Sequence, residues 1–296
     1  PATAFAYDED VVVSVEKGLL NTSGKALDDY TFSFKTHREY SAAEQLHFRN
    51  LHNILLEEEL KENGVNHSLG ETSDTRDVTG QFTIEVNNNP SPEKIFYDTR
   101  NGYWQESVFN SFQIIDTNGD SIYGGPNLLY YQDFKINKNG YLSVFNSAEL
   151  REEVLDSSYH LIDKYYPANG YPINGHDFQL LPDGRAFMIA DEYQVVDMTV
   201  YNPNFYPAAN VVGSVIQEFD ANHNLLFEWH SFDHIDIPEA IHENLAAGYI
   251  DYVHTNSLEI DNDGNIIASH RRLDQVTKID INTGEFIWRM GGLKGN

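Results

Sequence analysis

The stretch His176-Asp-Phe-Gln-Leu-Leu-Pro-Asp-Gly184 has two counterparts along the chain, and this repeat decides the fold. The counterparts are Gln132-Asp-Phe-Lys-Ile-Asn-Lys-Asn-Gly140 and His254-Thr-Asn-Ser-Leu-Glu-Ile-Asp-Asn-Asp-Gly264. Each unit begins with a polar residue, continues as a strand and turns at an Asn-Gly or Asp-Gly pair. Such a pair between apolar segments is typical of a tight β-hairpin.

Each unit continues with three more predicted strands. The second strands are Tyr141–Phe145, Arg185–Ala190 and Asn265–Ser269, and a second hairpin follows each of them at 153–163, 214–230 and 276–290. Four strands per unit, recurring with insertions, predict an all-β chain of the β-propeller class. A β-sandwich has the same density of turns, but it would not repeat the residues that begin each unit.

The number of units bears on the extent of the domain. A partial unit at 112–123 precedes the three complete ones, and the last strand is followed by only six residues. Propellers close with at least four blades and often with more. We therefore expect a propeller that is incomplete in this chain, with its C-terminal blades missing.

The N-terminal third differs from the repeat. Segment 1–36 contains two predicted strands and forms a small β module, either the tail of an Ig-like sandwich or a strand pair docked on the main domain. Segment 37–94 contains one predicted helix at 41–62, where apolar residues recur at helical spacing, and then a polar linker. The propeller occupies 95–296.

Composition excludes several classes of function. The 296 residues include 19 Lys and Arg against 46 Asp and Glu, a net charge of −27, which disfavours nucleic acids and anionic membranes as partners. There is no Cys, so disulfides, thiolate metal sites and a Cys nucleophile are excluded. The sequence contains neither an 18-residue apolar run nor a P-loop, dinucleotide or serine-hydrolase motif, so we expect no membrane insertion.

The repeat itself suggests a site. His176 and His254 each stand at the start of the first strand of a unit, where Gln132 stands in the preceding unit. Because these strands lie nearest the propeller axis, we expect the two imidazoles to lie close together, with Arg271 nearby. Two His and one Arg would bind an anion such as sulfate or phosphate. The alternative is that they only hydrogen-bond neighbouring strands.

Other candidate sites carry weaker signals. His230, Asp233, His234 and Asp236 could bind a metal, but a loop between blades is the favoured interpretation. Segments 116–120 and 261–265 resemble the start of calcium loops, yet they lack the Gly at the sixth position and the Glu at the twelfth, and they are better explained as hairpin turns.

These units resemble the bacterial arylsulfotransferase family, whose members use aryl sulfate esters rather than a nucleotide sulfate donor. The resemblance rests on Gly175–Gly184, on Asp251-Tyr-Val-His-Thr-Asn-Ser257 with Ser269-His-Arg271, and on Val276–Gly292. It implies a six-bladed propeller with an N-terminal β domain, exported to the periplasm or the cell exterior.

The resemblance also implies a chemistry. His176, His254 and Arg271 would be catalytic, with Arg272 in place of Arg271 if the turn at 262–265 shifts the register by one. A sulfuryl group would pass from a phenolic ester to a histidine, and then to a phenol acceptor, without a metal or organic cofactor. The histidine that becomes sulfated would lie on a later blade. A homo-oligomer is compatible with the sequence.

Two alternatives belong to other classes of function. One is a non-catalytic exported propeller that binds a ligand or another protein. The other is a sulfate-ester hydrolase that uses water in the same pocket. The dependence of donor turnover on added phenol separates transfer from hydrolysis.

Overall fold

The structure is a computed structural model that describes residues 10–15, 30–35, 88–98, 112–124, 131–147 and 149–295.

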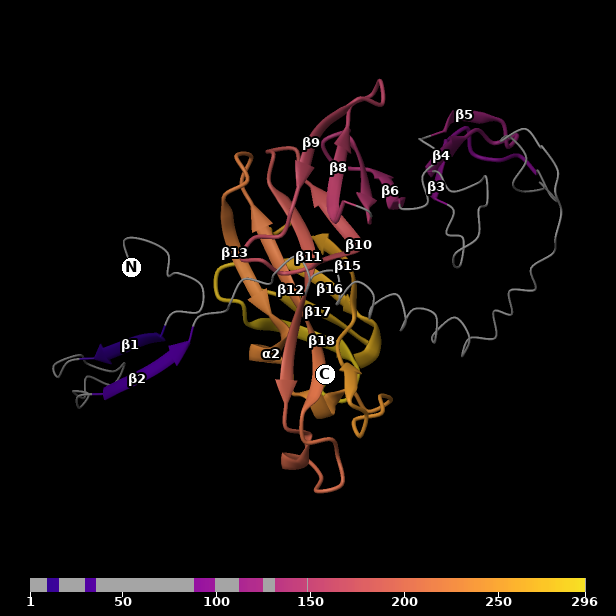
Figure 1. Cartoon of the computed structure of the whole chain (residues 1–296). Helices are drawn as coiled ribbons and strands as arrows, with labels where there is room; N and C mark the ends of the chain where they lie inside the picture. Colours follow the sequence, from indigo (N-terminus) through magenta and orange to yellow (C-terminus); the bar gives the residue numbers. More distant parts are fainter. Residues whose placement is uncertain are drawn as a thin grey trace.

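Four consecutive sheets form the blades of a β-propeller (Figure 1). Blade 1 contains β3 (Ile95–Asp98), β4 (Phe112–Ile115) and β5 (Ser121–Gly124), and blade 2 contains β6 (Tyr131–Ile136), β7 (Leu142–Asn146), β8 (Arg151–Leu155) and β9 (Leu161–Tyr165). Blade 3 contains β10 (Ile173–Leu180), β11 (Ala186–Val196), β12 (Ala209–Phe219) and β13 (Leu225–His230), and blade 4 contains β15 (Thr255–Ile260), β16 (Ile266–His270), β17 (Gln275–Ile279) and β18 (Phe286–Gly291). The predicted propeller, with one partial and three full blades, is confirmed.

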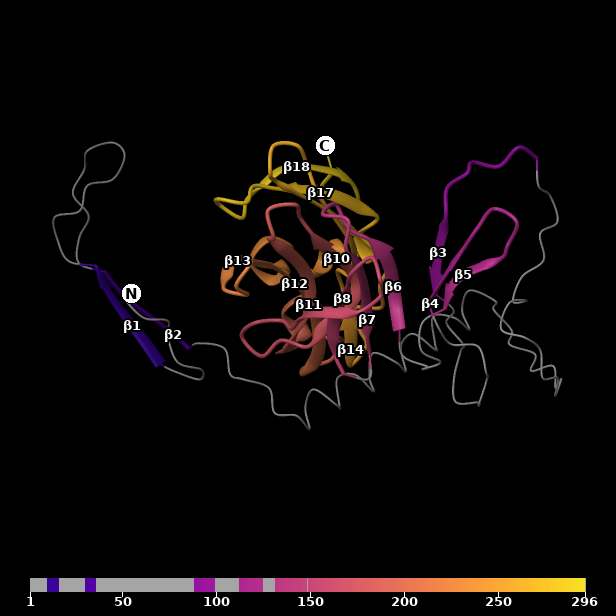
Figure 2. The same ribbon diagram turned by 90° about the horizontal axis from the view of Figure 1, so that it is seen from above.

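The four sheets lie beside one another in chain order (Figure 2). Each interface between consecutive blades has its own apolar cluster. Strand β11 shows how one sequence serves two interfaces. Ala186 and Met188 face blade 2, whereas Phe187 and Ile189 belong to the cluster shared with blade 4. Alternate residues of a strand point to opposite faces, so a central strand that is covered on both sides must be apolar throughout.

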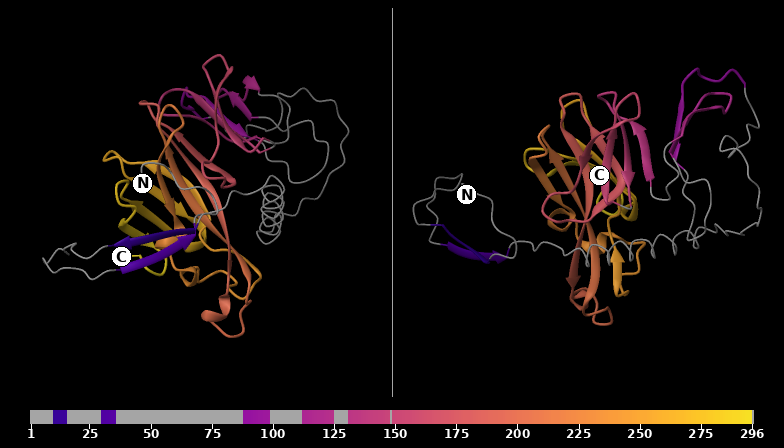
Figure 3. Two further views of the ribbon diagram at one scale, coloured as in Figure 1. Left: turned by 60° about the vertical axis from the view of Figure 1, so that its left-hand side comes forward. Right: turned by 45° about the horizontal axis from the view of Figure 1, so that its top comes forward.

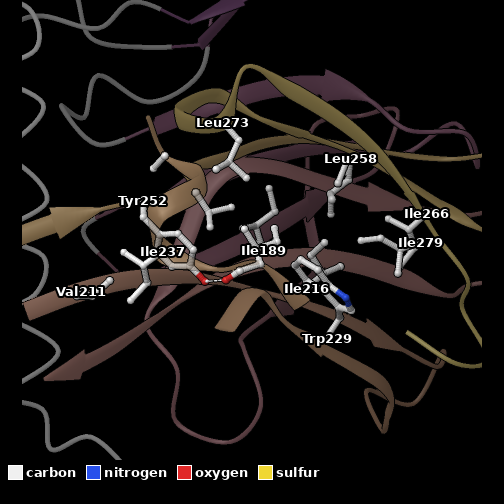
Figure 4. Close-up of a cluster of buried hydrophobic side chains, with 14 of the residues drawn as sticks. Ile189, Val211, Ile216, Trp229, Ile237, Tyr252, Leu258, Ile266, Leu273 and Ile279 are labelled. Carbon is white, nitrogen blue, oxygen red and sulfur yellow. Dashed lines mark hydrogen bonds between the residues drawn. The ribbon is translucent and has the colours of Figure 1, made fainter. Parts of the chain in front are cut away.

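The largest cluster lies between blades 3 and 4 (Figure 4). Trp229 is its largest side chain, and the indole Nε1 donates to the carbonyl of Gly284 at 3.0 Å. That bond satisfies the only polar group of a fully buried ring. The same cluster contains Ile216 from blade 3 and Ile266 and Ile279 from blade 4 (Figure 4).

Side chains of one blade also accept main-chain bonds from the next. Asn137 Oδ1 accepts the N–H of Leu180 at 2.9 Å, and Asp177 Oδ2 accepts the N–H of Leu258 at 2.6 Å. Both acceptors are buried. Because a buried main-chain N–H must have a partner, these contacts set how one innermost strand lies beside the next.

Blade 3 carries an extension that the sequence did not predict. Strands β11 and β12 each have 11 residues and pair along their whole length, so their hairpin projects beyond the blade (Figures 1 and 3). A short strand, β14 (Tyr249–Asp251), pairs in parallel with the extended part of β12. The predicted strands Arg185–Ala190 and Ser214–Asp220 were therefore too short at the hairpin end.

The N-terminal predictions lie mostly outside the described residues. Strands β1 (Asp10–Val15) and β2 (Tyr30–Lys35) form an antiparallel pair. The predicted helix at 41–62 is not among the described residues, and its prediction stands untested. Within the described part, no helix is long and apolar enough to cross a membrane.

Candidate active site

The rings of His176 and His254 contact each other. Their centroids lie 4.9 Å apart, and the rings meet edge to face at 76°. His176 lies in β10 of blade 3, and His254 directly precedes β15 of blade 4. The positions in the two repeats differ, because His176 stands eight residues before its turn glycine and His254 ten before its own. The structure therefore brings the two imidazoles together although they are not equivalent in the repeat. Gln132 lies half-buried on β6.

His254 has an unusual backbone conformation. Its φ is +50°, in the left-handed region that costs a non-glycine residue roughly 1–3 kcal/mol when the surrounding structure enforces it. Two bonds hold this turn: the N–H of Arg271 donates to the carbonyl of His254 at 3.0 Å, and the N–H of Arg272 donates to that of Val253 at 3.2 Å. The 3₁₀ turn η3 (Arg271–Leu273) is thereby fixed beside the histidine.

The Asp251 carboxylate sets the charge of His254. The imidazole Nδ1–H donates to Asp251 Oδ2 at 2.5 Å, and the His254 side chain is 7% exposed. Burial lowers the pKa of His254, but the bond to Asp251 and the charge of that carboxylate outweigh burial, so the pKa is raised above 6.5. With Nδ1 bound to a carboxylate, Nε2 is the nitrogen left to accept or give a proton.

The extended hairpin of β11 and β12 positions two carboxyl groups near His254, those of Asp251 and Asp191. Asp251 is placed by the parallel pairing of β14 with β12, in which it lies opposite Val212. Asp191, on β11, is buried and accepts a bond from Asn174 Nδ2 at 2.8 Å. Burial raises the pKa of Asp191 to about 7. The repeat pattern gave no indication of a role for Asp251, Asn174 or Asp191, although the Asp251-x-x-His254 spacing is a local signal in the sequence.

Two adjacent arginines supply positive charge. Burial, and then the charge of Arg272, lower the pKa of Arg271. Arg272 donates to Glu243 Oε1 at 3.0 Å, and its charge reaches His254. Its Nε is buried without a hydrogen-bond partner within the described residues. Guanidinium groups bind sulfate-like and phosphate-like anions through paired N–H donors, so either arginine has the chemistry for an anion. The structure thus places both Arg271 and the alternative, Arg272, beside the His254 turn.

The weaker candidates have structural explanations. His230 bonds to Glu192 and Glu228, whereas His234 stacks on Trp229 with centroids 5.2 Å apart. Lys278 Nζ donates to both Asp261 and Asp263, at 2.6 Å each, and so occupies the turn that resembled a calcium loop. In the described ranges, no three acidic, His or Cys side chains form a group that could hold a metal ion.

Three of the solved structures that match this chain share at most 13% sequence identity with it. Hydrazine synthase of Kuenenia stuttgartiensis is 13% identical over 60% of this chain and 42% of its own, with a TM-score of 0.34. A streptogramin B lyase is 11% identical over 61% and 47%, with a TM-score of 0.36. Virginiamycin B lyase of Staphylococcus aureus is 11% identical over 68% and 67%, with a TM-score of 0.35. The chain thus spans less than half the length of the first two.

The family of the chain follows from a match to a family model. No curated protein matches the sequence. A family model described as arylsulfotransferase (ASST) matches residues 74–295, which include all four blades and every site residue above. The chain belongs to the arylsulfotransferase family.

Proposed function

We propose that the protein is an aryl-sulfate sulfotransferase that moves a sulfuryl group from a phenolic sulfate ester to a phenol. One observation carries the proposal: two contacting histidines lie beside a pair of arginines, one of which has an unsatisfied buried donor. The turn that holds His254 also carries Arg271 and Arg272, and guanidinium groups are well suited to bind the oxygens of a sulfuryl group. Family membership supports the same chemistry.

The first half of the reaction sulfates the enzyme. A neutral imidazole nitrogen forms a bond to sulfur as the bond from sulfur to the aryl oxygen breaks, and the electron pair of that bond leaves on the phenolate. His254, whose pKa is raised by Asp251, gives its Nε2 proton to the phenolate. Arg271 and Arg272 neutralise charge on the sulfuryl oxygens, as cations do in phosphoryl transfer.

The second half returns the enzyme to its initial state. The oxygen of the acceptor phenol attacks sulfur, the N–S bond breaks, and His254 Nε2 takes the phenolic proton. The cycle is ping-pong and involves neither oxidation nor reduction. By the resemblance, the histidine that becomes sulfated belongs to a later blade, and the protein acts outside the cytoplasm.

The test measures phenol release from 4-nitrophenyl sulfate by the full-length protein, with and without an acceptor phenol. We expect turnover that depends on the acceptor, with a sulfated acceptor as product. Turnover at the same rate without acceptor would show a hydrolase instead. No turnover, together with binding of the donor, would favour a non-catalytic binding module.

Variants of the site test the residue assignments. His254→Gln and Arg271→Ala should each abolish transfer while leaving the melting temperature close to that of the native protein, and Arg272→Ala distinguishes the two arginines. Exposed residues serve as controls: His160→Gln and Lys94→Ala should retain full activity. Rates close to native in both the His254 and the Arg271 variant would refute the assignment.

A further inference from the structure

A chain of hydrogen bonds leads from Asp191 through Asn174 to His176. Asn174 Nδ2 donates to Asp191 Oδ1 at 2.8 Å. On its other side, Asn174 Oδ1 accepts the main-chain N–H of His176 at 3.1 Å and lies 2.5 Å from Nδ1 of the same ring. Both Asn174 and Asp191 are 7% exposed, so water does not compete freely for these groups.

The main-chain bond fixes which end of the amide faces the histidine. A backbone N–H can only donate, so the group that it meets must be the amide oxygen of Asn174 and not the amino group. The same oxygen lies at Nδ1, which must therefore carry a proton to form a bond. In the neutral ring, the lone pair is then on Nε2.

Local structure makes this geometry available. The pairing of β10 with β11 is interrupted between Asn174 and Phe178, and such a bulge redirects side chains. Gly175 lies within it, and a Cβ there would clash with the ring of Phe145. A residue with a side chain at 175 would have to displace either that ring or this segment. Glycine therefore fits the bulge between Asn174 and the histidine that it contacts.

The two histidines in contact thus have different partners. His254 has a carboxylate, Asp251, which stabilises the charged ring. His176 has a neutral amide, which selects a tautomer and is itself held by Asp191. The charges of Asp251 and His254 act on the carboxyl group of Asp191. In turn, the charge of Asp191 contributes to the raised pKa of Tyr193 and of Tyr249.

We propose that Asn174 and Asp191 are positioning residues that hold His176 as the Nδ1–H tautomer, so that Nε2 accepts the hydroxyl proton of the bound phenol in a hydrogen bond. The proposal deepens the proposed function and rests on it for the role of the phenol. His254 then carries the proton that moves, and His176 orients the hydroxyl group.

The tautomer is measured directly by NMR of the protein labelled with ¹⁵N-histidine, with the His176 signals assigned by their absence in His176→Gln. We expect Nδ1 to be protonated and Nε2 unprotonated in the native protein at a pH where the ring is neutral. In Asn174→Leu, which removes the acceptor, the other tautomer should appear. In the exchanged pair Asn174→Asp with Asp191→Asn, an acceptor and its donor are both present again, and the Nδ1–H tautomer should return at a pH where the ring is neutral.

Activity gives a second readout. Asn174→Leu should lower kcat for transfer about 10–100-fold, the loss typical of groups that orient metal-binding histidines, with little change in the KM for the donor. The exchanged pair should recover most of the loss, and Asn222→Leu, at an exposed turn position, should lose nothing.

A lone pair on Nδ1 of His176 in the native protein would overturn the proposal, and so would an unchanged tautomer in Asn174→Leu. The native measurement requires only one variant, His176→Gln, which serves to assign the signals. It also requires no turnover, so a protein with the expected tautomer and no transferase activity would refute the proposed function rather than the tautomer.

Discussion

His254 combines a left-handed backbone, a buried ring and a carboxylate partner. Residues in sparsely populated backbone conformations persist only where neighbouring groups enforce them, and they concentrate at functional sites. Here the enforcing groups are the main-chain N–H groups of Arg271 and Arg272. The same turn therefore places the histidine and both candidate anion-binding arginines.

The backbone of His254 predicts an inverted order of stability between two substitutions. His254→Gly should be more stable than His254→Ala by roughly 0.5–1 kcal/mol, because glycine adopts positive φ without steric cost. Denaturant unfolding measures the difference. At His160, which is exposed and not among the residues of positive φ, the order should be the usual one, with the glycine variant less stable. An alanine variant that is the more stable at both positions would show that the turn is not strained.

Asp251 predicts a change in the pH dependence of transfer. In the native protein, the pKa of His254 is raised above 6.5, so the proton needed by the leaving phenolate persists to higher pH. Asp251→Asn removes the charge that raises it, and the alkaline limb of kcat should move to lower pH by roughly 1 unit or more. The rate of the burst of phenol release, measured across a range of pH, gives the pH at which the alkaline limb falls. An unmoved limb would mean that His254 is not the acid.

The stability of the same variant changes with pH in a defined direction. A histidine whose pKa is raised on folding stabilises the fold fully below its unfolded pKa, near 6.5, and this contribution is lost as pH rises through the folded value. The loss of stability in Asp251→Asn should therefore be largest below that pH and should shrink above it.

At the scale of elements, the innermost strands are joined by side chains. Asp177 accepts the N–H of Leu258 from blade 4 and a bond from Gln179, and it forms an ion pair with Lys135 of blade 2. One buried carboxylate thus links three successive blades. Apolar packing between sheets does not specify their offset to the same degree, because it has little directionality.

Removal of this carboxylate should loosen the blades. Asp177→Ala leaves the buried N–H of Leu258 without an acceptor and Lys135 with Asp133 as its remaining carboxylate partner. It should lower the free energy of unfolding by about 1–3 kcal/mol. The matched control is Asp120→Ala, at an exposed position of the β4–β5 turn, for which we expect a change within about 0.5 kcal/mol. Equal losses in the two variants would show that the contact to blade 4 contributes nothing.

At the scale of the whole molecule, folding also buries the carboxyl group of Glu152 without a hydrogen-bond partner among the described residues. Glu152 on β8 is 1% exposed, and neither of its carboxyl oxygens has a hydrogen-bond partner in the described part of the chain. Burial, and then the negative charge of Asp133, raise its pKa well above 4.5. The folded protein therefore binds this proton more tightly than the unfolded chain does.

Glu152→Gln should stabilise the protein increasingly as pH rises. A carboxyl with a raised folded pKa loses its favourable contribution as pH rises from the unfolded value, 4.5, through the folded one, whereas glutamine does not titrate. Melting temperatures of the two proteins should be similar near pH 4.5 and should diverge above it. A constant difference across pH would show that Glu152 keeps its ordinary pKa.

Local signals explain how much of the fold the sequence predicted. Asn-Gly and Asp-Gly turns and alternating apolar residues act over a few positions, so the hairpins and the number of blades followed from the repeat. The bounds of most predicted strands agreed with those in the structure to within two residues. His176 and His254 were recognised because each opens a repeated unit, and the Asp251 bond to His254 spans only three residues.

Long-range pairing explains what remained. The extended hairpin and its parallel contact with β14 join residues such as Asn210 and Tyr249, and no local pattern marks that pairing. The link from Asp191 to His176 depends on a bulge, and the burial of Glu152 depends on the stacking of neighbouring blades. The sequence by itself determined the all-β repeat, the turns and the identity of the two histidines, because these depend on short-range conformational preferences. Only the tertiary structure decided which carboxylate and which amide each imidazole meets, because packing between strands and blades brings those groups into contact.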